Sequence, residues 1–219
     1  MNLIKKIVVL LFFLIPLASA EIQITKNINT NYNIGDKLSY AVSIIEDKNI
    51  VQGFVSSILN CDKNSLTYFI LPVSLIQGTK QDVSVPDLTI KEEMLGSCFI
   101  TLNIQDLNKN NLEKLDLANF IVSNNLDIEA FLNKQTYIPG DEVQLTGNVK
   151  NIRGELLDNV PVTVIIDNKE TKLVNVNNKK FSLAFKLDDN AKSFEHTISL
   201  EENTNGNSAK KTVQFYVAP

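Results

Sequence analysis

His196 is the side chain in this sequence best suited to proton transfer, because it is the single histidine among 219 residues and its ordinary pKa lies near neutrality. A general base would need a Ser, Cys or Asp partner beside it in a cleft. His196 lies instead between Phe194 and Ile198, in phase with an apolar stripe. We expect a core-edge side chain that bonds to nearby backbone, and we predict no catalytic residue and no enzyme activity.

The only two cysteines, Cys61 and Cys98, fall far short of a zinc site with one distant histidine. In an exported chain they are expected to form a disulfide, which on the chain-entropy model stabilises a loop of about 38 residues by ~4 kcal/mol. Cys98 is in phase with a buried stripe and Cys61 ends a strand, so the bridge would tie a turn to the core. The alternative is two buried free thiols.

The spacing of Asp106, Asn108 and Asn110 offers the alternating oxygen donors that calcium loops use, and residues 203–207 occupy a corresponding loop later in the chain. Calcium takes six to eight oxygens, often with a closing bidentate Glu and a Gly at the turn. Neither loop supplies that set. We therefore expect solvated turns and no cofactor, with calcium as the alternative.

A Tyr-x-x-Gly-Asp turn occurs twice, 105 residues apart. Because each copy follows a short alternating segment and opens another, the spacing predicts two tandem domains of one kind. The aspartates are expected to cap their own turns. The residues of the repeated turn are Tyr32, Gly35 and Asp36, then Tyr137, Gly140 and Asp141.

Apolar and polar residues alternate through the chain with the two-residue period of half-buried strands. In the last 94 residues, stripes such as Val143, Leu145 and Val149 predict about seven strands separated by turns. The N-terminal half shows the same alternation less regularly, over Leu38 to Ile44 and Cys98 to Ile104. Residues 72–86 are expected to absorb its longer loops, and residues 107–117 to hold a short helix.

Seven short strands with a turn every 8 to 12 residues are typical of immunoglobulin-like sandwiches. We predict an all-β chain with two tandem immunoglobulin-like β-sandwiches, over residues 21–124 and 125–219, after an N-terminal signal peptide. The boundary near residues 123–125 leaves almost no linker, so the domains are expected to lie end to end with limited freedom.

Residues 1–20 have the pattern of a signal peptide, with Lys5 and Lys6 before an apolar run of about 11 residues, too short for the ~20 that span a bilayer. Cleavage is expected after Ala20, with Ala18 and Ala20 as the small residues of the site. The prediction is a secreted, cell-surface or periplasm-like location without a membrane span after removal. The alternative is an apolar helix that stays as an anchor.

Removal of Lys5 and Lys6 with the leader leaves 19 basic residues against 25 acidic ones, a formal charge of −6. Nucleic acid is therefore excluded as an expected partner. The charges are interspersed, which argues against a polybasic membrane patch.

One set of turn and strand residues in the C-terminal half forms a recognisable pattern. Its members are Tyr137, Pro139, Gly140, Asp141, Val143, Leu145, Gly147, Val149, Gly154, Leu156, Val160, Val162, Val164, Phe181, Leu183, His196, Ile198 and Leu200. In this pattern the chain resembles the prokaryotic immunoglobulin-like repeats of surface proteins and the macroglobulin-type MG2 module. The resemblance is strong over residues 126–217 and weak over 21–123, where Ile34 stands in place of Pro139 and Val42 in place of Gly147. It implies a spacer, adhesion or assembly role on the cell envelope and no active site.

Three functions are consistent with these features. The first is a non-catalytic structural, adhesive or spacer module of the envelope, with other envelope or surface proteins or glycans as partners. The second is a two-domain periplasmic chaperone, which should show an exposed hydrophobic edge strand and a basic anchor between its domains. The third is an accessory carbohydrate-binding region of a secreted protein, which the absence of Trp weakens.

Overall fold

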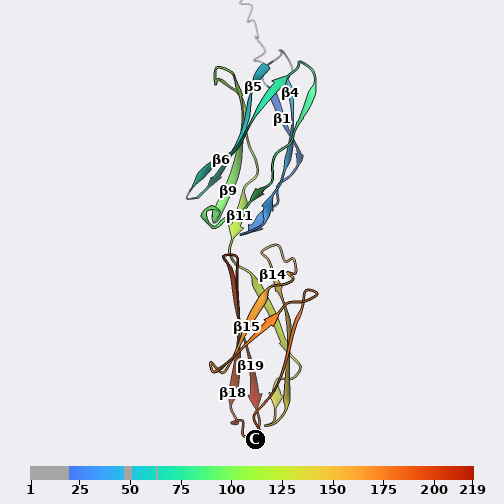
Figure 1. Cartoon of the computed structure of the whole chain (residues 1–219), viewed down its shortest axis with the longest axis vertical. Helices are drawn as coiled ribbons and strands as arrows, with labels where there is room; N and C mark the ends of the chain where they lie inside the picture. The colour runs from blue at the N-terminus through green and yellow to red at the C-terminus, as the bar shows by residue number, and fades with distance from the viewer. Residues whose placement is uncertain (1–19, 47–50, 63) are drawn as a thin grey trace, which may run out of the picture.

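The chain is all-β over residues 20–46, 51–62 and 64–219, which are the residues that the computed structural model describes (Figure 1). Most of the expected signal peptide, including Ala18, lies outside the described residues, and Ala20 begins strand β1. Within these ranges the only helical segment is one 3-10 turn, η1 (Glu92–Met94). No helix within them is long and apolar enough to cross a bilayer.

Residues 20–123 form the N-terminal unit, whose described residues build one sheet of order β1-β4-β7 and a larger one of order β2-β11-β9-β5-β6. Strand β10 also pairs with β9, and β3 with β8. The strands are β1 (Ala20–Lys26), β2 (Asn31–Asn33), β3 (Lys37–Leu38), β4 (Ala41–Glu46), β5 (Val51–Cys61), β6 (Ser65–Leu75), β7 (Lys80–Val83), β8 (Leu88–Thr89), β9 (Gly96–Asp106), β10 (Asn111–Asp116) and β11 (Phe120–Ser123).

Residues 126–217 form the C-terminal unit, with one sheet of order β12-β14-β17 and a second of order β13-β19-β18-β15-β16. The two units follow one another along the long axis of the molecule (Figure 1). The strands are β12 (Asp127–Leu132), β13 (Thr136–Tyr137), β14 (Glu142–Lys150), β15 (Pro161–Ile166), β16 (Glu170–Asn175), β17 (Phe181–Lys186), β18 (Glu195–Thr204) and β19 (Asn207–Val217).

The strand orders of the two units correspond position by position. In both, the last strand of the unit lies between an antiparallel neighbour and a short strand that pairs with it in parallel, β11 with β2 and β19 with β13. A parallel pair requires a crossover connection, so this pattern is a specific feature of topology.

Each unit buries a separate apolar core between its sheets. The alternation expected from the sequence is confirmed: Val143, Leu145 and Val149 of β14 have no exposed surface, and neither do Ile100 and Leu102 of β9. Because successive side chains of a strand point to opposite faces, this pattern aims one face of each strand at the core.

The short helix expected at residues 107–117 is wrong, because the chain forms a turn and then strand β10 along the edge of β9. Lys109 adopts a positive φ of 64°, and its N–H bonds to the Asp106 carbonyl at 3.0 Å. The turn thus folds the chain back, and β10 finds its hydrogen-bond partners on β9 instead of within a helix.

Residues 72–86, which were expected to absorb the longer loops of the N-terminal half, also contain strand residues. Pro72 lies inside β6, opposite Phe54, and β7 begins after the four residues 76–79. Proline is tolerated there because β6 is the outermost strand of its sheet, where a missing N–H breaks no necessary ladder bond.

Cys61 and Cys98 form the expected disulfide. They lie directly opposite one another on neighbouring strands β5 and β9. Cys61 also begins the β5–β6 turn, where its carbonyl accepts the Asn64 N–H at 3.1 Å. The bridge therefore joins a turn to a core strand within one sheet. A disulfide indicates an oxidising environment during folding.

Replacing Cys61 and Cys98 together by alanine is expected to lower the free energy of unfolding by about 4 kcal/mol, because the unfolded chain loses a cross-link that closes a long loop. Urea unfolding of the variant and of the oxidised wild type measures the difference. Reduced wild type is the matched control and should show the same loss with both side chains kept. A loss under about 1 kcal/mol in both would contradict the stabilising role.

Candidate functional site at the junction

The two turn tyrosines make equivalent contacts. The Tyr32 hydroxyl accepts the Asn29 N–H at 2.9 Å, and the Tyr137 hydroxyl accepts the Lys134 N–H at 3.2 Å, each from three residues earlier. Each ring also packs edge-on against a phenylalanine of the last strand of its unit. These pairs are Tyr32–Phe120 and Tyr137–Phe215, both with ring centroids 5.3 Å apart.

The aspartates of the same turns accept hydrogen bonds from their own backbone. Asp36 Oδ2 accepts the Asn33 N–H at 2.8 Å, and Asp141 Oδ2 accepts the Ile138 N–H at 3.2 Å. Positive φ at the preceding residue explains the glycine there, since other residues meet steric cost in that region. The glycines are Gly35 with φ 91° and Gly140 with φ 82°.

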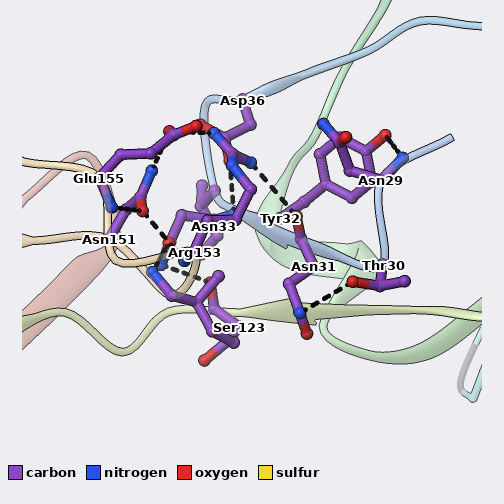
Figure 2. A network of polar contacts seen from close by, with 12 residues as sticks. Asn29, Thr30, Asn31, Tyr32, Asn33, Asp36, Ser123, Asn151, Arg153 and Glu155 are labelled. Carbon is purple, nitrogen blue, oxygen red and sulfur yellow. Dashed lines mark hydrogen bonds and ion pairs between the residues drawn. The ribbon is translucent and has the colours of Figure 1, made fainter.

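Arg153, the only arginine of the chain, reaches from the C-terminal unit to the first of these turns (Figure 2). Its Nη1 lies 2.6 Å from Asp36 Oδ2 and donates to the Asn31 carbonyl at 3.2 Å, while Nη2 donates to Glu155 Oε2 at 2.8 Å. The guanidinium also lies 5.8 Å from the centre of the Tyr32 ring, within cation–π range. The repeated turn of the N-terminal unit is therefore part of the contact between units.

The charges at this contact stabilise one another. Hydrogen bonding to Glu155 and then to Asp36 raises the pKa of Arg153, against an opposing effect of burial. Hydrogen bonds from Arg153 and Asn151 lower the pKa of Glu155. Burial raises the pKa of Tyr32, so its hydroxyl stays neutral beside the guanidinium. Arg153 and Glu155 thus both favour their charged forms at this contact.

The loop between β14 and β15 positions Arg153. Asn151 Oδ1 accepts the backbone N–H groups of Arg153 at 3.0 Å and Glu155 at 2.9 Å. Gly154 completes the turn with φ 79°. An Asn side chain that satisfies two N–H groups in this way fixes the turn of residues 151–155 within the loop of residues 151–160.

Asn33 is the second anchor of the junction and is only 3% exposed. Its Oδ1 accepts the Ile152 N–H from the C-terminal unit at 2.7 Å. Its Nδ2 donates to the carbonyl of Ser123, at the end of β11, at 3.1 Å and to that of Asn125, in the segment that connects the units, at 2.9 Å. One amide therefore binds its own unit, the connecting segment and the other unit.

Asn207, at the start of β19, pairs with the backbone of Ile34 in the manner of a strand neighbour. Its Nδ2 donates to the Ile34 carbonyl at 2.9 Å and its Oδ1 accepts the Ile34 N–H at 3.2 Å. Buried polar groups that are satisfied in this way specify one arrangement, because any other would leave them unpaired.

Glu202 of β18 lies close to these asparagines and has no exposed surface. It lines a cavity of about 200 Å³ together with Asn33, Asp36 and Asn207. Burial raises the pKa of the Glu202 carboxyl, and the Thr204 hydroxyl offsets this only in part. That hydroxyl does not reach hydrogen-bond geometry with either carboxylate oxygen.

His196 lies far along β18 from the junction and bonds to both sides. Its Nδ1 is 2.6 Å from Asp167 Oδ2 and its Nε2 is 3.0 Å from the Lys192 carbonyl. The ring stacks between Phe194 and Phe215, at 4.3 and 5.2 Å. Both nitrogens thus have structural partners. The expected core stripe is wrong at Phe194, which is 45% exposed because it precedes the first residue of β18.

Asp106, Asn108 and Asn110 lie in the β9–β10 turn. Both carboxylate oxygens of Asp106 accept hydrogen bonds from Asn110, one from its backbone N–H at 2.9 Å and one from its side chain at 2.8 Å. These bonds lower the pKa of Asp106. Across the part of the chain that the structure describes, no cluster of three or more His, Cys, Asp or Glu side chains could together coordinate a metal ion.

No family model and no curated protein sequence matches the chain. Among solved structures it is similar to the crystal structure of a beta-glucosidase from Listeria innocua, at 13% sequence identity and a TM-score of 0.36. The similarity covers 48% of this chain and 16% of that one. At this TM-score it supports no argument about fold or function.

The junction residues Arg153, Asn33, Asn207 and Glu202 lie far apart in the sequence, and no single motif marks them as a group. Two signals were present: Arg153 is the only arginine, and Glu202 continues the buried alternation of Ile198 and Leu200. The asparagines gave no signal, because Asn is common in solvated turns.

Replacing Arg153 by alanine is expected to lower the free energy of unfolding by about 1–3 kcal/mol, because Asp36 and the Asn31 carbonyl lose a partly buried donor. Cleavage of the connecting segment by a non-specific protease should also become faster. The control is Lys186→Ala, which removes a cation from an exposed pair with Asp189 and should change stability by less than about 0.5 kcal/mol. Equal behaviour of the two variants would contradict the role of Arg153.

Glu202 is expected to make stability fall as the pH rises. Below its ordinary pKa of 4.5, the carboxyl is protonated in both the folded and unfolded chain. Above 4.5 the unfolded chain releases this proton first, because burial raises the folded pKa, so the contribution of Glu202 is lost as the pH passes through the folded pKa.

Urea unfolding of wild type, Glu202→Gln and Glu201→Gln at pH 5 and pH 8, in buffer with EDTA, measures this effect. The Glu202→Gln variant should keep more of its stability at pH 8 than wild type does. Glu201→Gln changes the neighbouring residue on the other face of β18 and should retain the wild-type pH dependence. An unchanged pH dependence in Glu202→Gln would count against the buried acid.

Proposed function

We propose that this chain is an exported, non-catalytic structural or adhesive module of the cell envelope, in which two tandem immunoglobulin-like β-sandwiches hold a partner-binding surface at a fixed distance. The observation that carries the proposal is the junction. Arg153 and Asn33 bind across it through short hydrogen bonds, which favours a spacer over two independently mobile domains.

Tandem immunoglobulin-like domains are supported by the equivalent strand orders of the two units, including the parallel pairs β2–β11 and β13–β19. The matching contacts of Tyr32 and Tyr137 add to this. Sandwiches packed end to end in this way place their loops and outer sheet faces at the surface.

Export is supported by the disulfide between Cys61 and Cys98, since such bonds persist in oxidising compartments. The leader pattern of residues 1–20 agrees with that location. Partners on the envelope, either proteins or glycans, follow from a location outside the cytoplasm.

A chaperone that pairs strands with a client is a second candidate, favoured by strand β6. This strand lies at the edge of its sheet and exposes Leu66 and Ile70, as a client-binding edge would. The expected basic anchor is the weaker part of this candidate. Arg153 lies between the units, but both of its terminal nitrogens already bind acidic side chains of this chain.

The proposed location and role are tested on cells that make the full chain. Protease added to intact cells should degrade the chain, and capture from an envelope extract should recover a reproducible partner. The Arg153→Ala variant should recover less of that partner, because its binding surface is no longer held at a fixed distance. Lys186→Ala is the matched control and should capture as wild type does.

Three results decide between the candidates. Recovery of the chain with cytosolic proteins would overturn the envelope role. Recovery of many unfolded envelope proteins with wild type, and their loss with the Ile70→Glu variant of strand β6, would favour the chaperone. Recovery of one partner by both wild type and the Ile70→Glu variant would support the structural or adhesive module.

A further inference from the structure

Glu202 is a carboxylate at a position where its strand otherwise buries apolar side chains. Strand β18 points Ile198 and Leu200 into the core of the C-terminal unit, and Glu202 continues that alternation with no exposed surface. Neither of its oxygens has a hydrogen-bond partner among the residues of the described ranges. A buried carboxylate is costly unless a proton or a cation compensates its charge.

The cavity beside Glu202 lies between the two units and has a volume of about 200 Å³. Its wall includes Asp36 from the N-terminal unit, and Thr204 and Asn205 from the turn that follows β18. The Thr204 hydroxyl is a second buried oxygen without a partner. No Lys, Arg or His belongs to this wall, so nothing in it neutralises Glu202.

We propose that this cavity binds one hard divalent cation, for which Ca²⁺ is the best fit, with Glu202 as its charged ligand. The buried side-chain oxygens of the wall that have no partner are those of the Glu202 carboxylate and the Thr204 hydroxyl, and Asn205 adds an amide oxygen. Calcium and magnesium prefer such oxygens, while zinc and copper favour nitrogen and sulfur. Ca²⁺ accepts irregular sets of six to eight oxygens, whereas Mg²⁺ demands near-ideal octahedral geometry. A cavity of about 200 Å³ also has room for the waters that complete the shell.

The cation at this place contacts walls from both units, so its binding stabilises their mutual arrangement by mass action. This site is distinct from the Asp106 turn, where Asn110 already occupies both carboxylate oxygens. The inference rests on Glu202 and the cavity, and it holds whether or not the chain is an adhesive module.

The experiment uses the full chain stripped of metal with EDTA. Calorimetric titration with CaCl2 and thermal unfolding with and without CaCl2 are measured for wild type, Glu202→Gln and Glu201→Gln. Wild type and Glu201→Gln are expected to bind one Ca²⁺ and to unfold at a higher temperature in its presence. Glu202→Gln should bind at least tenfold more weakly and lose the temperature shift. Mg²⁺ should bind more weakly than Ca²⁺ to wild type.

Absence of Ca²⁺ binding to wild type at millimolar concentration overturns the proposal, and so does binding that survives unchanged in Glu202→Gln. Displacement of Tb³⁺ luminescence by Ca²⁺ on wild type gives a second readout that requires no variant to fold. Equal loss of binding in both glutamine variants would also overturn it, because a general loss of surface charge would then explain the effect.

Discussion

The contact between Arg153 and Asp36 joins the C-terminal unit to the first turn of the N-terminal unit across 2.6 Å. The arrangement of the whole molecule depends on it, because only a few residues connect β11 to β12. A connection that short brings the units together but leaves their rotation open. The guanidinium and the Asn33 amide remove that freedom, since each buries polar atoms that another orientation would leave unpaired.

The two copies of the turn show how one local motif serves two purposes. Asp36 and Asp141 both accept a backbone N–H of their own turn. The second partner differs: Asp141 pairs with Lys134 in its own unit, whereas Asp36 pairs with Arg153 from the other. The ion pair of the junction therefore depends on Arg153 in the β14–β15 loop. Asp36 accepts it while keeping the hydrogen bond to its own turn.

Much of the fold was predictable from the sequence because burial of one strand face leaves a two-residue period. The β class, the cores and the positions of the turns follow from that period and from turn chemistry. The disulfide follows from the presence of two cysteines in a chain expected to be exported. Strand β10 was missed because its pairing depends on the distant strand β9. The junction was missed for a similar reason: Asn33 and Asn207 have the composition of solvated turns, and only contact between distant segments buries them.

The parallel pairs β2–β11 and β13–β19 have a mechanical consequence. Tension between the two ends of a unit pulls the first strand of such a pair toward its N-terminal end and the last strand toward its C-terminal end. The hydrogen bonds between them are then loaded in shear, so all of them bear the force at once instead of breaking one after another. Each unit carries such a clamp, so a stretched molecule would bear load in series through both.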